Sequence, residues 1–364
     1  MNLADMLTYA DIGQLSRIAN HYRCECNGNS KHELIQSILQ TIGRREFIEH
    51  HVAEMSLEDL RFLNALIFDG RRQFSLEELI ACAQQSRFTE DARERESPRD
   101  VIARFRQRGW LFQGMTHNTR YLFEVPEDLK RRFREALERL IRAETVIIKG
   151  EPAMYREEPE LLSEDLLLFL QYVREHEIPL NNEGVMYRRN QLQVLEKLHI
   201  SEPLVGKGWR FGYGRRFKDY PNRLALLYDY ASHAKWIRED MDRLRLTAAG
   251  EAFLSEQKRE PMIHFVSFWL RLYKGPIPNL PSLVYWIERC SKEWVAASSL
   301  YAGMSMLIKP FYYDSPESIF EERVLRMMLH LGMVRIGDDG QGEKYVQTTP
   351  FGRSAVHKLL KMQN

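Results

Sequence analysis

Two segments in the second half of the chain repeat one pattern, and this repeat restricts the possible folds more than any other feature. They read DRLRLTAAGEAFL and KYVQTTPFGRSAV, and each has an apolar strand, a Thr, two residues, a Gly and a returning helix. Thr247–Gly250 and Thr349–Gly352 coincide when the segments are superposed. Upstream of each, a proline-initiated helix runs into a strand, and a polar segment predicts a hairpin turn. The repetition indicates two copies of one structural unit, at 161–256 and 257–364.

A third copy is predicted at 52–126. Its first helix is expected after an N-cap at Ser56, its second after an SLEE capping box at Ser75, and its third after Ser97, with Pro98 at the first helical position. Two apolar-aromatic runs around GMTHN then predict a hairpin. The predicted fold class is mainly α with small β-hairpin wings (α+β). It consists of three tandem winged-helix units behind a small N-terminal helical module.

The remaining segments flank these units. Residues 1–48 predict two or three short helices, with a capping box of Ser30 and Glu33 starting the last one. This region has a helix, a polar turn and then the segment SKHELIQSIL. The arrangement resembles the SAP-type helix–loop–helix, a small module that often binds DNA. Residues 127–160 predict a connecting helix followed by a linker with two prolines and a run of acids.

Tandem winged helices behind a helical module, with strands that close on a Thr-x-x-Gly helix, resemble the N-terminal region found beside XPB/Ssl2-type helicases. The chain has no GxxxxGK[ST] phosphate-binding loop, which puts helicase activity in doubt. The resemblance implies DNA binding or partner docking, as an accessory to a helicase or another DNA-processing enzyme.

Composition limits how such a chain can bind a polyanion. The 52 Lys and Arg residues nearly cancel the 51 Asp and Glu residues, so nucleic-acid contact requires local basic patches. Four cysteines and no evident secretory leader favour a reducing compartment. No apolar run approaches the roughly 20 residues of a membrane helix. The expected location is therefore cytoplasmic, with no membrane contact.

The segment GKGWRFGYGRRFK, residues 206–218, is the most basic part of the chain, with five cations, four aromatics and no acid. As extended chain it places the aromatics on one face and most cations on the other. The aromatics then pack on the core and the cations are solvated, or the segment is a basic flap that contacts phosphates. The candidate phosphate contacts come from this segment and from the preceding helix. They are Lys207, Arg210, Arg215, Arg216 and Lys218 of the segment, and Arg188 and Arg189 of the helix.

A second candidate is the third helix of the 52–126 unit. Its apolar residues are expected to face the core and to leave an exposed basic face that suits the DNA major groove. A solvated face rich in arginine is the alternative. The residues concerned are Arg99, Arg104, Arg106 and Arg108.

Neither a metal site nor catalytic machinery is predicted. His21, Cys24, Cys26 and His32 lie within twelve residues, but Cys-x-Cys is not the usual zinc-finger spacing. We expect no catalytic residue, no metal and no cofactor. The predicted function is non-enzymatic DNA binding, on duplex DNA with single strands as the open alternative. The rival interpretation is a protein-interaction scaffold without direct DNA contact.

Overall fold

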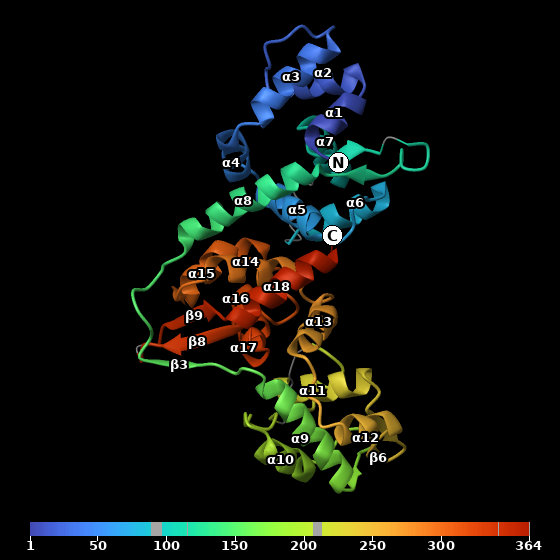
Figure 1. Ribbon diagram of the computed structural model, residues 1–364, viewed down its shortest axis with the longest axis vertical. Coiled ribbons are helices and arrows are strands. Elements are labelled where there is room, and N and C mark those ends of the chain that lie inside the picture. Colours follow the sequence, from blue (N-terminus) through green and yellow to red (C-terminus); the bar gives the residue numbers. More distant parts are fainter. Residues whose placement is uncertain (89–96, 115, 207–212, 341, 364) are drawn as a thin grey trace.

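The computed structural model describes residues 1–88, 97–114, 116–206, 213–340 and 342–363. This part of the chain is mainly helical, with three small antiparallel sheets. The molecule is elongated, with the N-terminal helices at one end, residues 161–256 at the other and the C-terminal third between them (Figure 1). Within the described ranges, no helix is both long and apolar enough to cross a bilayer.

Four short helices open the chain: α1 (Leu3–Tyr9), α2 (Ile12–His21), α3 (Lys31–Ile42) and α4 (Arg45–Ala53). The predicted capping box at the start of α3 is only half right. The Ser30 side chain accepts the Glu33 N–H at 3.3 Å, but the Glu33 carboxylate accepts the N–H of Asn27 at 3.2 Å. Glu33 thus closes the preceding turn and leaves the backbone N–H of Ser30 to the Asn27 carbonyl.

Residues 52–126, the first unit, have the predicted order. The elements are α5 (Leu57–Phe68), α6 (Leu76–Gln85), α7 (Pro98–Gln107), β1 (Phe112–Gln113) and β2 (Phe123–Glu124). Ser56, Ser75 and Ser97 cap the three helices, as predicted. Phe74, between α5 and α6, exchanges two backbone hydrogen bonds with Phe123 of β2, at 2.8 and 2.7 Å.

The predicted connecting helix is α8 (Glu127–Glu144), which packs against α4, α14 and α15. The segment after it is more than a linker. β3 (Met154–Arg156) pairs antiparallel with β8 of the C-terminal third, with Tyr155 opposite Gly337. Pro152 lies so close to Gly337 that a Cβ there would meet the proline ring at 2.4 Å. The chain is therefore bound to the C-terminal third before it enters residues 161–256.

Residues 161–256 form the second unit, whose sheet has the strand order β4-β6-β5. Its elements are α9 (Leu161–Glu175), β4 (Ile178–Pro179), α10 (Arg188–Lys197), α11 (Asn222–His233), β5 (Ile237–Asp240), β6 (Arg243–Leu246) and α12 (Ala248–Ser255).

Residues 257–364 form the third unit, whose sheet has the order β3-β8-β9-β7. Its helices are α13 (Met262–Tyr273), α14 (Leu280–Cys290), α15 (Ala297–Met304), the 3-10 turn η1 (Ser305–Leu307), α16 (Pro316–Ser318), the π-helix η2 (Ile319–Leu325), α17 (Arg326–His330) and α18 (Pro350–Gln363). Its strands are β7 (Val295–Ala296), β8 (Val334–Asp338) and β9 (Lys344–Thr348).

The repeated Thr and Gly occupy equivalent positions in the second and third units. The side chains of Thr247 and Thr349 accept the N–H of Gly250 and Gly352, at 3.1 and 2.9 Å. A Cβ on either glycine would meet a backbone carbonyl oxygen of the preceding hairpin region, at 2.3 and 2.1 Å. The segments that end in these threonines are strands, as predicted. Both α12 and α18 need glycine at this position because the backbone of each helix lies in direct contact with the backbone at the start of its hairpin, which leaves no room for a side chain.

The pairing of the short strands also recurs. In each unit a short strand pairs with the second hairpin strand: β4, which follows α9, pairs with β6, and β7, which follows α14, pairs with β9. The Phe74–Phe123 bridge takes the same place in the first unit.

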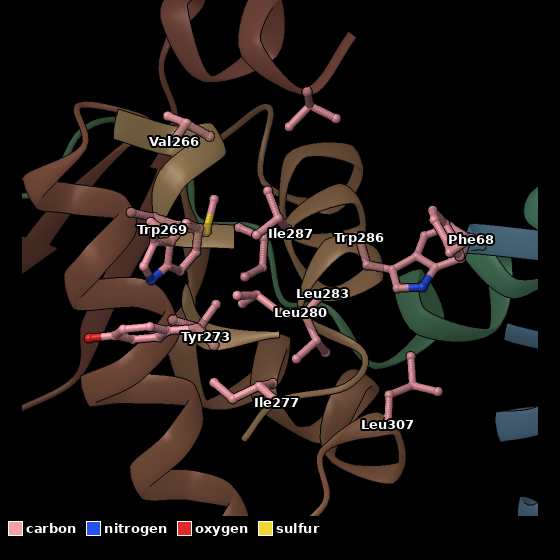
Figure 2. Close-up of a cluster of buried hydrophobic side chains, with 14 of the residues drawn as sticks. Phe68, Val266, Trp269, Tyr273, Ile277, Leu280, Leu283, Trp286, Ile287 and Leu307 are labelled. Atoms are coloured by element: carbon pink, nitrogen blue, oxygen red, sulfur yellow. The ribbon is translucent and has the colours of Figure 1, made fainter. Parts of the chain in front are cut away.

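A buried apolar cluster lies between α13 and α14 and extends to the first unit (Figure 2). Trp269 and Trp286 are fully buried, and Phe68 of α5 meets the Trp286 ring edge-on at 5.3 Å. Buried Asn64 of α5 accepts the Trp286 indole N–H at 3.1 Å and donates to Ser282 at 2.9 Å. The first and third units therefore share one core.

Buried charges join the second unit to the third. The Arg223 side chain on α11 is wholly buried and donates to Asp165 at 2.6 and 3.0 Å and to Glu158 at 2.8 Å. His330 of α17 also contacts Glu158, at 2.9 Å. Burial by itself raises the pKa of Glu158, but the hydrogen bond and charge of His330, with the charges of Arg223 and Arg156, hold that pKa below its ordinary value.

Candidate nucleic-acid interface

The four arginines predicted on the third helix of the first unit have different environments. Arg104 bonds the carboxylate of Asp59 through Nε and Nη2, at 2.9 and 2.8 Å, and Arg108 reaches the same carboxylate at 3.0 Å. The Asp59 side chain is 3 % exposed. A buried carboxylate requires counter-charge, so these two arginines stabilise the fold. The expectation that they form an exposed basic face is wrong.

Arg99 and Arg106 lie on another side of α7. With Ala103 they follow i, i+4, i+7 spacing and form one stripe, which we call the outer stripe of α7. Arg99 is exposed, and Arg106 is half-buried and donates to Gln113 of β1 at 3.2 Å. Within the described ranges neither forms an ion pair.

One flank of α7 is covered by α2, which the sequence did not predict. The Tyr22 hydroxyl donates to the Arg108 carbonyl at 2.7 Å, and a Cβ on Gly109 would meet Ile18 at 3.2 Å. The outer stripe of α7 therefore lies beside the N-terminal helices and is not surrounded by solvent on all sides.

The hairpin of the first unit adds a basic and aromatic tip. The Arg120 guanidinium lies 4.6 Å from the centroid of the Tyr121 ring, which is 67 % exposed. Hydrogen bonds between Thr116 and Thr119 order the turn. Arg120 and Tyr121 are not among the residues predicted above, although an Arg beside a Tyr in a predicted hairpin turn is visible in the sequence.

The basic segment 206–218 differs from its prediction as extended chain. Lys207 and Arg210 lie outside the described residues. From Tyr213 onward the chain bends, with Gly214 at φ +99° and a turn that begins at Arg216, so side chains do not alternate between two faces. Tyr213 is buried as predicted and packs edge-on against Tyr273 at 5.0 Å.

Arg215 and Arg216 of this segment are both bound to other residues of the second unit. Arg216 is buried, not solvated, and donates to the Glu239 carboxylate at 2.6 Å and to the Glu183 carbonyl at 2.9 Å. Arg215 is exposed but also donates to Glu239, at 2.9 Å. Arg216 therefore stabilises the fold, because its buried guanidinium group neutralises the Glu239 carboxylate.

Three further candidates of the second unit remain at the surface. Lys218, Arg188 and Arg189 are all exposed. Arg188 donates to the Val205 carbonyl at 3.1 Å, which places the start of α10 beside the residue that directly precedes the basic segment.

The helices that correspond to α7 are α11 in the second unit and η2 with α17 in the third unit. Neither presents a basic face without acidic partners among the described residues. In α11, residues 223–231 are all buried. In the third unit, Arg323 is bound to Asp314 at 3.0 Å, and Arg326 is paired with Glu322. Among the third helices, as far as the structure describes them, α7 alone presents arginines without acidic partners.

The cysteines and histidines have local contacts. Cys24 Sγ lies 3.5 Å from the Thr41 hydroxyl, and no group of three or more metal-ligating side chains gathers in the part of the chain that is described. Burial raises the pKa of the Cys82 and Cys290 thiols to about 12, which keeps both neutral in their apolar surroundings.

No protein-family model, no curated protein and no solved structure matches this chain.

Proposed function

We propose that the protein is a non-enzymatic DNA-binding protein made of three tandem winged-helix units, and that its first unit makes the main DNA contact. The recurring order of helix, short strand, two helices and hairpin supports the winged-helix assignment. In such units the third helix enters the major groove and the hairpin lies beside it.

The observation that carries this proposal is the outer stripe of α7. Arg99 and Arg106 have no acidic partner among the described residues, and Arg106 is tied to β1, where the hairpin of Arg120 and Tyr121 begins. Free guanidinium groups are suited to phosphates and to guanine edges, whereas arginines held by acids are not. With a net charge of +1, the molecule relies on such a local surface.

A protein-interaction scaffold is the second candidate function, and the helices that correspond to α7 in the second and third units favour it. α11 is buried along residues 223–231 and cannot enter a groove. Along η2, the half-buried Glu321 and Glu322 are paired with Lys344 and Arg326, so these cations are held by acids and are not suited to phosphates. In this alternative the second and third units dock proteins, and DNA contact is absent.

Binding of labelled random duplex DNA from about 50 to 200 mM salt separates the two candidates. The variant Arg99→Gln/Arg106→Gln should weaken binding and lower the slope of log affinity against log salt by up to about 1.8, at about 0.9 per phosphate contact. The matched control is Arg131→Gln, because Arg131 is exposed on α8 and has no ion pair within the described ranges. It should leave affinity unchanged.

The same assay distinguishes the first unit from the second. If Arg188→Gln/Arg189→Gln/Lys218→Gln weakens binding and the α7 variant does not, the contact lies on the second unit. If the unaltered protein binds no duplex even near 50 mM salt, DNA binding is refuted and the scaffold stands.

A further inference from the structure

A pocket lies between α2 and α7, at the junction of the N-terminal helices and the first unit. Its volume is about 180 Å³, many times the roughly 10–15 Å³ that one water needs. The lining residues are Gln14, Arg17, Ala103, Arg106 and Gln107. Four of the five carry hydrogen-bond donors, and none is acidic.

Two positive charges share this pocket. Burial lowers the pKa of Arg106, and the charge of Arg17 on the opposite helix lowers it further, against a smaller opposing effect of Asp11. Asp11 itself caps α2 by accepting the Gln14 N–H at 2.7 Å. Neither arginine forms an ion pair among the described residues, so the like charges repel and Asp11 offsets that repulsion only in part.

The pocket also contains an unpaired donor. Nε2 of Gln14 is buried and has no hydrogen-bond partner in the part of the chain that the structure describes. A buried donor without an acceptor costs about 1–3 kcal/mol, which an acceptor in the pocket recovers once the Gln14 amide turns toward it. An oxyanion supplies both what the donor lacks and the negative charge that the arginines lack.

The two walls are held rigidly. Ile18 of α2 and Tyr22, which directly follows this helix, fix α2 against the Arg108–Gly109 turn at the end of α7. The helix backbones that carry the donors are therefore fixed before any ligand arrives, which reduces the entropic cost of binding.

We propose that this α2–α7 pocket binds a phosphate group, with Arg17, Arg106 and the Gln14 amide as its donors. The inference rests on the proposed function in taking a backbone phosphate of DNA as the source. Arg106 belongs to both the pocket and the outer stripe of α7. A strand lying along Arg99 thus places a phosphate between the first unit and the N-terminal helices, and both hold the DNA.

The test uses the full-length protein and two ligands: inorganic phosphate, titrated calorimetrically at constant ionic strength, and duplex DNA across a salt series. Arg17→Gln should weaken phosphate binding at least about tenfold, since hydrogen bonds to charged groups contribute more than neutral ones. It should lower the DNA salt slope by about 0.9. Arg131→Gln serves as the control and should change neither.

Gln14→Leu is the second variant, because it removes the unpaired donor and keeps a similar volume. It should weaken phosphate binding while the thermal midpoint stays the same or rises, since no buried polar group is left unpaired. A variant that merely disrupted α2 would lower the midpoint.

The outcomes separate the two proposals. If duplex DNA binds but Arg17→Gln leaves its salt slope unchanged and phosphate gives no saturable heat, the pocket assignment is overturned and DNA binding stands. If phosphate binding depends on Arg17 but no duplex binds, the pocket stands for free phosphate or a phosphorylated side chain, and DNA binding falls. If Arg131→Gln reduces phosphate binding as much as Arg17→Gln, phosphate binds the protein non-specifically and the pocket assignment is overturned.

Discussion

Replacing Arg223 by alanine should be among the most damaging single changes in this chain. Its side chain is 0 % exposed, as are those of its partners Glu158 and Asp165, and it joins them through three hydrogen bonds of 3.0 Å or less. Removing one partner of a buried ion pair leaves uncompensated buried charge and costs about 3–5 kcal/mol. This is a large share of the roughly 5–15 kcal/mol that stabilises a folded protein.

Urea denaturation at pH 7 measures this loss. With an m-value of about 3 kcal/mol/M, the expected cost lowers the midpoint by about 1–1.7 M. Arg156→Ala is the matched control, because Arg156 contacts the same Glu158 carboxylate at 2.5 Å but is 51 % exposed. Exposed pairs contribute about 0–1 kcal/mol, so the control should shift the midpoint far less.

Lowering the pH should reduce the difference in urea midpoint between the unaltered protein and Arg223→Ala. The folded-state pKa of Glu158 lies below its ordinary 4.5, so Glu158 adds stability above that value, and the contribution is lost as pH falls through the folded pKa. Without Arg223 the folded pKa is higher and less stability is lost on acidification. A midpoint shift no larger than that of Arg156→Ala, or a difference that widens in acid, would refute the reasoning.

Two further predictions concern close packing. Gly352→Ala should destabilise by about 1–3 kcal/mol, because its Cβ would lie 2.1 Å from the Met333 carbonyl oxygen; Gly275→Ala, with nothing within 4 Å, should leave the thermal midpoint unchanged or slightly raised. An unchanged midpoint for Gly352→Ala would contradict the close crossing of α18 over its sheet. Asn64→Ala should cost about 1–3 kcal/mol, since the buried Trp286 indole N–H loses its acceptor. Thermal denaturation followed by tryptophan fluorescence measures this loss, and a cost below about 0.5 kcal/mol would mean that Trp286 finds another acceptor.

The local parts of the fold were predictable because their determinants are close together in the sequence. Ser97 and Pro98 start α7 within one turn, and Thr349 caps a helix three residues before Gly352. Helix starts and strand–helix corners of this kind depend on neighbouring residues, and the sequence reveals them well.

The candidate site was less predictable because its charges pair over long distances. Nothing near Arg104 and Arg108 in the sequence shows that Asp59 neutralises them, whereas Arg99 and Arg106, with the same composition around them, form no ion pair within the described ranges. The extended interpretation of the basic segment failed at Gly214, where a positive φ turns the chain and buries Arg216. The covering of α7 by α2 likewise follows from tertiary packing that no short pattern encodes.

The pairing of β3 with β8 has a consequence for how the chain could have been assembled. Residues 154–156 belong to the sheet of the third unit, so the second unit leaves that body and returns to it, like a domain inserted into a host. The two crossing points are close together, since Arg259 bonds Glu160 at 3.0 Å and Glu164 at 2.8 Å. Insertions with neighbouring ends can be gained or lost as one block. The first and third units with β3 thus form a continuous host, and the second unit is the part that a lineage could exchange, provided that its replacement also brings a positive charge to buried Glu158, as Arg223 does.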